Sequence, residues 1–480
     1  MRKDDGSPSA GHVPRRRLAW ALGVAALSAA TVTGATAGTA AAGTAAGSQG
    51  SGAIGLSDPT GGGHAYRHGA LPLRTGAGHL GAAAVAAPSS TSPQGAGQGS
   101  RGPLRYRGGP VVTGSPRVYL VFWGSQWGTP STGAGGYQHF SGDPDGLAPD
   151  LQAFFAGLGT DGELWSATVT QYCRGTTTGA KACPVAPGAD HVAFPGAGVL
   201  GGVWEDTSIT PPQGAFAGDS SVGGVDGTQL AQEAADAAVH FGDSSSQAQF
   251  VIVSPPLTNP DGWLDPRNGY CAYHDNSGDP FFAGHVTGPA VAYTNFPYIP
   301  DAGVGGCAST GMNGVLDGVN ETASHEYAET LTDPDASTGW LDRRGNEIAD
   351  KCDYVSPGLP GAAVYLTLAT GTFDVQGLWA NDSGRSGGCE VAHSAVLVTA
   401  PGNERSVTGA PVSVPMTAVD VRGQTLGYAA VGLPAGLSIN PTSGVVSGIP
   451  MIRGRTTVTV TVSDTSSTAS VRFKWVVSKH

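Results

Sequence analysis

Residues 323–334 read ASHEYAETLTDP and predict one short amphipathic helix that ends at a proline. Apolar side chains recur in this stretch at helical spacing and would face a core. His325 and Glu329 are four residues apart, so their side chains project from the same face of the helix. A His and a carboxylate held in this way can bind a divalent metal. The adjacent Glu326 could then take a proton from a water molecule at that metal.

The pattern His-Glu-x-x-Glu is similar to the H-E-x-x-H motif of zinc hydrolases, with the second His replaced by Glu. A different interpretation is a surface helix, because several glutamates and one His are common where charges are solvated. The neighbouring residues favour the metal. Glu321 lies one turn before His325 and Asp333 one turn after Glu329, so three carboxylates surround one His. A bound cation would relieve their mutual repulsion.

Helix geometry limits the third ligand. Eight residues of helix rise about 12 Å, whereas metal–ligand bonds are about 2 Å long. His325 and Asp333 therefore cannot share an ion if the helix runs straight through. Asp333 precedes a proline, which disfavours the helical conformation and lets the chain turn back towards the metal. We predict that His325, Glu329 and Asp333 bind Zn²⁺ and that Glu326 is the general base.

Other ligands stay open. Asp350 and Asp353, on either side of Cys352, are the alternatives to Asp333. His274 and His285 could each be brought close by folding, although a structural or surface role is favoured for both. Ca²⁺ is a less favoured cofactor than Zn²⁺, because the Asp-Pro-Asp sequences at 143–145 and 333–335 do not continue into an EF-hand loop.

The beginning of the chain has the pattern of a targeting segment. Three arginines at 15–17 precede an apolar run diluted with small residues, which predicts a signal peptide over residues 1–43. No second long apolar segment follows, so we predict a secreted, extracellular protein with no transmembrane anchor in its mature form. Residues 44–103 are rich in Gly, Ala and Ser and predict a disordered linker.

In the linker, His64, His68 and His79 are interpreted as incidental. An inhibitory propeptide is the alternative for residues 44–103, but they contain no cysteine whose thiolate could block a metal.

Composition supports export. The chain has 76 Gly among 480 residues, 13% charged residues and a formal net charge of −12, which argues against a nucleic-acid partner. Its six cysteines lie between residues 173 and 389 and predict disulfides in an exported protein. Fifteen pairings are possible. We predict the sequential one, Cys173–Cys183, Cys271–Cys307 and Cys352–Cys389.

Residues 104–393 predict a central, disulfide-bearing domain that contains the motif helix. Buried strands are expected over 117–123, 163–172 and 249–254, and helices over 149–158 and 228–241. Residues 255–313 are expected to be mostly irregular, and residues 340–352 a hairpin or ordered loop. Alternating strands and helices indicate an α/β or α+β fold with a mixed sheet. By analogy, zincin hydrolases place their motif helix under such a sheet.

Residues 394–480 change in character and alternate short Val/Thr strands with turns, which predicts a small all-β sandwich. Residues 432–450, GLPAGLSINPTSGVVSGIP, resemble the Ig-like module of bacterial surface proteins, a cadherin-like sandwich. That resemblance implies an adhesion or spacer module, sometimes associated with calcium, although no complete calcium motif is present.

Five short blocks of the central domain occur in the same order as in the phosphate-induced protein (exordium-like) family, which residues 105–390 resemble. They begin at Gly108, Val118, Gly269, Gly314 and Glu347, and the third and fifth end at His274 and Cys352. The resemblance implies a secreted domain. The plant members are extracellular proteins without the His-Glu pair, whereas bacterial relatives often keep it.

Two functions follow from these patterns. The first is a secreted, zinc-dependent metallopeptidase that acts on extracellular peptides or proteins. The second is a non-catalytic extracellular binding or adhesion protein that attaches to the cell wall or to carbohydrate, with the same residues holding a structural ion or none.

Overall fold

The computed structural model describes residues 67–74, 102–185, 190–207, 227–265, 269–384 and 386–479. The predicted signal peptide lies outside these ranges, as do His64, His79 and most of the predicted linker. Among the described residues, no helix is long and apolar enough to cross a membrane. We call residues 102–393 the central domain and residues 394–479 the C-terminal module, and we describe each by itself.

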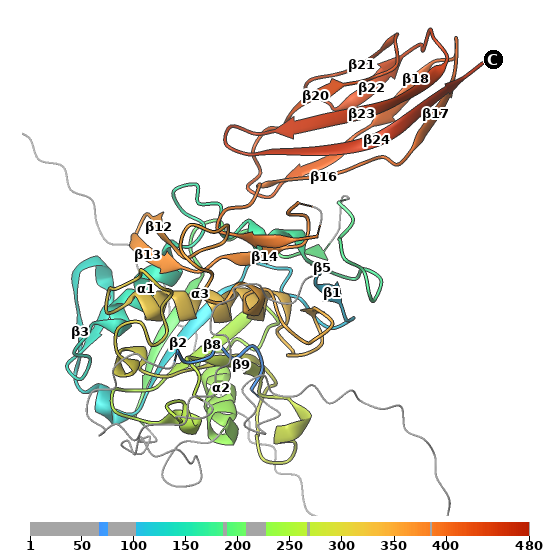
Figure 1. The fold of residues 1–480 in the computed structure, drawn as a ribbon. Helices are drawn as coiled ribbons and strands as arrows, with labels where there is room; N and C mark the ends of the chain where they lie inside the picture. Colours follow the sequence, from blue (N-terminus) through green and yellow to red (C-terminus); the bar gives the residue numbers. More distant parts are fainter. Residues whose placement is uncertain are drawn as a thin grey trace, which may run out of the picture. The chain divides into compact units, whose positions relative to one another are not determined.

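A five-stranded mixed sheet forms the middle of the central domain (Figure 1). Its strands, in spatial order, are β7 (Leu200–Asp206), β2 (Arg117–Trp123), β8 (Ala248–Val253), β10 (Ala292–Phe296) and β9 (Tyr273–Asn276). The first four are parallel to one another, whereas β9 runs antiparallel to β10 at the edge of the sheet. The predicted strands at 117–123 and 249–254 are confirmed as β2 and β8.

Helices cover both faces of this sheet. They are α1 (Leu147–Gly157), α2 (Gly227–Phe241) and α3 (Asp317–Thr332). Gln249 of β8 donates a hydrogen bond to Thr330 of α3, whereas the next residue, Phe250, packs its ring against Phe241 of α2. Successive strand residues face opposite sides, so α2 and α3 cover opposite faces, as Figure 1 shows.

The remaining strands of the central domain form two-stranded pairs. The pairs are β1 (Arg105–Tyr106) with β11 (Trp340–Leu341), β3 (Pro130–Thr132) with β4 (Gln138–Phe140), β5 (Cys173–Arg174) with β6 (Asp190–His191), β12 (Val364–Leu368) with β13 (Gly371–Val375), and β14 (Leu378–Ala380) with β15 (Gly388–Glu390). The predicted disulfides Cys173–Cys183, Cys271–Cys307 and Cys352–Cys389 are all confirmed. They link β5 to the loop that follows it, Cys271 just before β9 to the loop after β10, and the short 3-10 helix at Asp350–Cys352 to β15.

One sequence prediction in the central domain is wrong. Residues 163–172 form turns and a short 3-10 helix rather than a strand, because the Glu163 carboxylate accepts hydrogen bonds from the backbone N–H groups of Gly159 and Ser166 and turns the chain. The described part of residues 255–313 is mostly irregular, as predicted, but it also contains the short strands β9 and β10. These strands carry buried polar residues, such as Asn295, whose amide donates to the Tyr270 hydroxyl. Their apolar alternation is therefore missing.

Part of the predicted disordered linker is ordered. Residues 67–74 lie against the central domain, with Arg67 paired to Asp261 at 2.9 Å and Leu71 fully buried. The prediction of disorder is wrong for these eight residues, because a buried ion pair and an apolar contact hold them in place.

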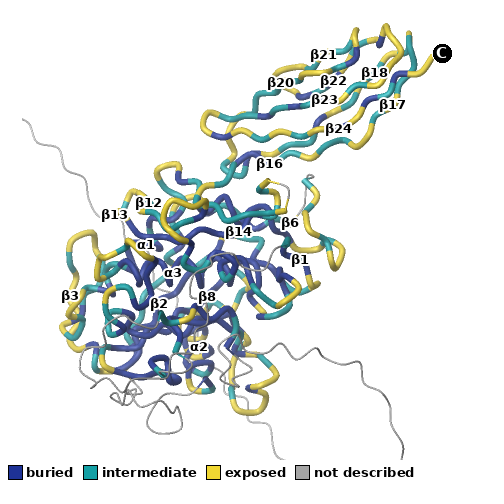
Figure 2. Tube along the Cα trace, viewed as in Figure 1, coloured by how far each residue is buried: buried dark blue, intermediate teal, exposed yellow. Residues whose placement is uncertain are grey.

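The C-terminal module has its own core of buried side chains, which includes Val446, Val458 and Trp475. Its strands are β16 (Val396–Thr399), β17 (Glu404–Val407), β18 (Val412–Pro415), β19 (Thr417–Asp420), β20 (Gly427–Val431), β21 (Leu437–Ile439), β22 (Val445–Gly448), β23 (Gly454–Ser463) and β24 (Thr468–Ser478). They form sheets of order β17-β24-β23-β20 and β18-β22-β21 and the pair β16-β19. Figure 2 shows buried positions alternating with intermediate or exposed ones along the strands, as predicted for a sandwich.

His393, at the end of the central domain, generates a test of stability against pH. Its Nδ1 lies 2.7 Å from Glu390 and its Nε2 3.5 Å from Asp382. Burial alone lowers the pKa of His393, but hydrogen bonds to Asp382 and Glu390 raise it to about 9 from an ordinary 6.5. The stability that protonated His393 gains from Asp382 and Glu390 is fully present below pH 6.5 and is lost as the pH rises through 9.

We therefore expect His393→Gln to lower the free energy of unfolding at pH 6 by about 1–2 kcal/mol, a modest loss because Asp382 is well exposed and its charge is screened. At pH 9.5 the loss should be much smaller, because His393 is then mostly neutral. Urea unfolding of both proteins at the two pH values measures the difference. An equal loss at both values would contradict the assigned charge of His393.

Candidate metal centre

The motif helix α3 is buried along its whole length, and all 16 of its residues are classed as buried. The interpretation of a solvated surface helix is therefore wrong. Gln249 of β8 holds the helix against the sheet by donating to the Thr330 hydroxyl at 2.8 Å and to the Glu326 carbonyl at 3.4 Å. The acidic side chains of α3 consequently point into the protein rather than into water, where an unpaired charge is costly.

His325 and Glu329 converge as their spacing predicts. His325 Nε2 lies 3.2 Å from Glu329 Oε2 and 3.9 Å from Asp350 Oδ1. Ligand atoms on one tetrahedral zinc ion are separated by about 3.3 Å, given Zn–N and Zn–O bonds of about 2 Å. The His325–Glu329 pair thus has the separation that a shared ion requires.

The hydrogen bond of His325 Nδ1 determines which ring nitrogen carries the proton. Nδ1 lies 3.1 Å from Gln376 Oε1, whose amide is oriented by its own donation to the Ala349 carbonyl at 3.0 Å. Because an amide oxygen only accepts, Nδ1 carries the proton and Nε2 is directed to the acidic side of the site. Nε2 faces only oxygen atoms there, including the Gly69 carbonyl at 3.2 Å. A cation, either a second proton or a metal, would satisfy this arrangement.

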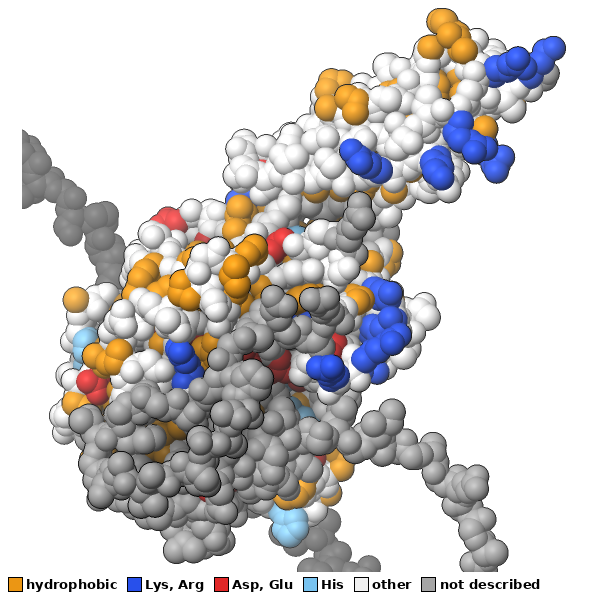
Figure 3. Space-filling view, viewed as in Figure 1, with side chains coloured by type: hydrophobic (Ala, Val, Ile, Leu, Met, Phe, Trp, Pro, Cys, Tyr) orange, Lys and Arg blue, Asp and Glu red, His pale blue; other side chains and the backbone are white. Residues whose placement is uncertain are grey.

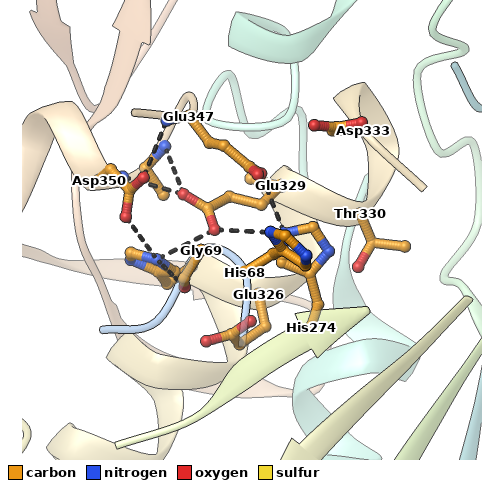
Figure 4. A network of polar contacts seen from close by, with 12 residues as sticks. His68, Gly69, His274, Glu326, Glu329, Thr330, Asp333, Glu347 and Asp350 are labelled. Atoms are coloured by element: carbon orange, nitrogen blue, oxygen red, sulfur yellow. Dashed lines mark hydrogen bonds and ion pairs between the residues drawn. The ribbon is translucent and has the colours of Figure 1, made fainter. Parts of the chain in front are cut away.

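A second imidazole approaches Glu329 from the sheet. His274 Nε2, on β9, lies 3.6 Å from Glu329 Oε2 and 2.9 Å from Glu347 Oε2. Glu329 Oε1 accepts hydrogen bonds from the backbone N–H groups of Ala349 and Asp350, which leaves Oε2 directed to both imidazoles. Figure 4 shows Glu329 between His274 on one side and Asp350 on the other.

Two possible ligand sets therefore share one carboxylate. They are His274, Glu329, Glu347 and His325, Glu329, Asp350, and within each set the ligand atoms lie within 4.8 Å of one another. The chemistry of both sets, imidazole with carboxylates, fits Zn²⁺ better than Ca²⁺, which prefers oxygen ligands alone. The residues present thus fit the predicted ion.

The charges of the site are strongly perturbed. Burial raises the pKa of Glu329 well above its ordinary value, and neighbouring Asp350 and Glu347 raise it further. Burial also raises the pKa of Glu347 and lowers that of His274 to about 4. Protons or a metal must therefore compensate the negative charge gathered here. Such perturbed groups gather at functional sites.

Glu326 is a buried acid with no partner. Neither of its carboxylate oxygens has a hydrogen-bond partner, and its side chain is 1% exposed. Burial raises its pKa well above the ordinary value, and the charge of Glu329 raises it further, against the opposing effect of His325. In Figure 4 no contact is drawn to Glu326. An unpaired buried carboxyl group beside a candidate metal site is suited to accept a proton from a water molecule.

The structure does not bring Asp333 to the pair. The chain leaves the helix at this residue, but its carboxylate accepts hydrogen bonds from the N–H groups of Ser337, Thr338 and Gly339 at 2.8, 3.1 and 2.7 Å. Figure 4 shows Asp333 apart from Glu329. The carboxylate stabilises the turn after α3, and the alternative, Asp350, is the carboxylate that lies on the Nε2 side of His325. Asp353 lies on the Nδ1 side of the imidazole, 3.5 Å from it.

The remaining predicted candidates lie outside the centre, each for a different reason. His285 is exposed and belongs to no ligand group among the described residues. Glu321 is held away from the site by Ser309, whose N–H and hydroxyl both donate to it. Asp143 accepts from the first N–H groups of α1 and so caps that helix.

Sequence reasoning disfavoured His274 and did not consider Glu347. The exordium-like resemblance could have pointed to both, because His274 and Glu347 lie in two of its blocks, at 269–274 and 347–352. The fold brings these blocks together across α3.

Residues 67–74 also reach the site. His68 pairs with His274 in an antiparallel bridge, and its Nδ1 lies 3.0 Å from the Ser337 hydroxyl. The next residue, Gly69, directs its carbonyl oxygen at His325. The interpretation of His68 as incidental is therefore wrong.

Comparisons with known proteins concern the C-terminal module. Residues 395–478 match the family described as "Putative Ig domain", which establishes the module as Ig-like. The match does not extend to the central domain, whose exordium-like resemblance stays a prediction. No curated protein sequence matches the chain.

Three similar solved structures illustrate how limited the likeness is. Human protocadherin-24 EC1-2 is 19% identical, over 17% of this chain and 43% of that chain, with a TM-score of 0.16. Drosophila N-cadherin EC1-3 is 18% identical, over 24% and 47%, with a TM-score of 0.18. A "putative alpha-galactosidase" of Bacteroides fragilis is 17% identical, over 17% of this chain and 17% of that chain, with a TM-score of 0.16. These scores are too low to support a functional argument.

The geometry predicts which variants lose the metal. We expect His325→Ala and Glu329→Gln to weaken Zn²⁺ binding at least a hundredfold and Asp350→Asn about tenfold, because each removes a ligand atom. Asp333→Ala should keep the metal while it loses about 1–3 kcal/mol of stability, since three N–H groups lose their acceptor. Metal content by mass spectrometry and urea unfolding measure both effects. Loss of zinc in Asp333→Ala with retention in Asp350→Asn would restore the original assignment.

Proposed function

We propose that the central domain is a zinc-dependent hydrolase that cleaves extracellular peptides. The observation that carries the proposal is the 3.2 Å approach of His325 Nε2 to Glu329 Oε2, with the unpaired Glu326 between them in sequence. A buried helix that crosses under a mixed sheet with an antiparallel edge strand supports a zincin-like arrangement. Disulfides and an Ig-like module are common in extracellular proteins, which agrees with the predicted location.

Each residue has a defined task in this proposal. His325, Glu329 and Asp350 would hold the ion, and His274 with Glu347 would orient Glu329 from the other side. A bound Zn²⁺ would lower the pKa of its water and polarise the peptide carbonyl. Glu326 would take a proton from a water molecule as the water oxygen adds to the carbonyl carbon. It would then give that proton to the amine nitrogen as the carbon–nitrogen bond breaks.

Glu326→Gln tests this assignment. We expect the variant to keep stoichiometric zinc and to lose hydrolysis by a factor of about 10²–10⁴, because an amide cannot accept the proton. Casein and peptide cleavage are measured before and after limited proteolysis, since residues 67–74 lie against the site. Glu321→Gln, one turn earlier on the same helix, is the matched control and should retain activity. Full activity in Glu326→Gln, or a zinc-free active protein, would refute the proposal.

A second candidate, attachment to the cell wall or to an anionic carbohydrate, is favoured by the charge of the C-terminal module. Residues 394–480 contain seven Lys and Arg against three Asp and Glu, in a chain whose net charge is −12. Figure 3 shows basic side chains spread along the visible face of this module. Such a surface attracts polyanions in a salt-dependent way.

Attachment can be separated from hydrolysis. We expect the full chain to bind an anionic polysaccharide at low salt, and the double variant Arg453→Ala/Arg455→Ala to bind at least fivefold more weakly. Glu326→Gln should bind unchanged, because the site lies in the other domain. Co-sedimentation at several salt concentrations measures this, and binding that ignores both salt and the arginines would contradict it.

A further inference from the structure

Residues 67–74 extend the main sheet at its edge. The N–H of His274 donates to the His68 carbonyl at 3.2 Å, and the N–H of Cys271 donates to Leu71 at 2.7 Å. The N–H of Leu73 in turn donates to Gly269 at 3.2 Å. The segment thus runs antiparallel to residues 269–274, which lead into the edge strand β9. An edge strand offers unpaired backbone groups to any extended peptide.

Gly69 stands at the candidate metal centre. Its carbonyl oxygen is 3.2 Å from His325 Nε2, the same separation as the Glu329 carboxylate. Its φ of +55° is unfavourable for other residues, and an added Cβ would collide with Glu329 Oε2 and lie 2.7 Å from His274 Nε2. The segment therefore places a backbone carbonyl at the ligand-facing side of His325, where a peptide to be cleaved would present its own.

Side chains on both sides of Gly69 occupy built positions. The Arg67 guanidinium is buried, pairs with Asp261 at 2.9 Å and stacks over the Tyr270 ring at 4.8 Å. Leu71 is fully buried. Both lie two residues from Gly69, and Ala70 between Gly69 and Leu71 is buried as well. Arg74 ends the segment by donating to the Ala308 carbonyl at 2.5 Å.

We propose that the β9 edge and the His325–Glu329 centre form a groove for an extended peptide, and that residues 67–74 occupy it as an intramolecular ligand that blocks the centre. The proposal rests on the proposed function and adds its substrate class. The groove accepts an extended peptide with a basic side chain two positions before the residue at the metal and an apolar one two positions after it. Release of the segment, by cleavage within residues 75–101, opens the site.

A glycine pair in the full chain tests the block. Gly69→Ala displaces the segment, whereas the control Gly175→Ala carries a similar φ strain, +80°, with no atom near its added Cβ. We expect amide hydrogen exchange at Cys271 and His274, which donate to the segment, to accelerate at least tenfold in Gly69→Ala alone. Zinc removal by a chelator should accelerate similarly, and peptide cleavage should rise at least tenfold.

Binding in trans tests the groove itself. A site-specific protease sequence inserted after Ser92 lets the full chain be cut and residues 1–92 be removed. A synthetic peptide of residues 65–76 should then bind one to one and restore the exchange protection of Cys271 and His274. The same peptide with Arg67→Ala or Gly69→Ala should bind at least tenfold more weakly, and a scrambled peptide should not bind.

The outcomes separate this inference from the proposed function. Restored protection and peptide binding without hydrolysis by any form would reject the hydrolase but keep the groove. Unchanged exchange in Gly69→Ala, together with no binding of the peptide to the cut chain, would overturn the groove whatever the activity. Hydrolysis by the intact wild-type chain at the rate of the cut chain would overturn the block.

Discussion

The carboxylate of Glu329 is the interaction on which the site depends. One of its oxygens is fixed by two backbone N–H groups, and the other lies between the imidazoles of His325 and His274. A buried carboxylate must be neutralised or paired, because desolvation of an isolated charge costs several kcal/mol. The loop at 347–353, the edge strand β9 and helix α3 each supply a polar group to this point. The same requirement explains why the helix can be buried although it is rich in acids.

Burial of α3 changes the meaning of its sequence. On a surface, the glutamates would be solvated and have no consequence for the fold. In the interior, an acid needs a hydrogen-bond partner or a proton, and the glutamates of α3 differ in what they find. Ser309 hydrogen-bonds Glu321, backbone N–H groups hold Glu329, and Glu326 has no partner. The exception is informative, because the one acid without a partner is the one that sits beside the two convergent ligands.

The sequence was sufficient for what depends on local spacing. Helical period placed His325 and Glu329 on one face, and cysteine order gave all three disulfides. It failed where a long-range contact decides. Asp333 was expected to turn back to the metal, but three N–H groups of the following turn compete for it. His274 comes from a short polar strand whose place beside α3 depends on sheet order, which no local pattern encodes. Residues 67–74 were predicted to be linker because the composition of a long Gly/Ala/Ser-rich stretch does not reveal a few specific contacts, such as the Arg67–Asp261 ion pair.

The disulfide Cys271–Cys307 joins the two loops that hold residues 67–74, since the N–H of Cys271 donates to Leu71 and the Gly306 carbonyl accepts from Arg74. Without this bond, the covalent link between the two loops would be missing, and only hydrogen bonds and packing would hold them together. Reduction of this bond would therefore loosen residues 67–74, so the segment is held most firmly in an oxidising environment.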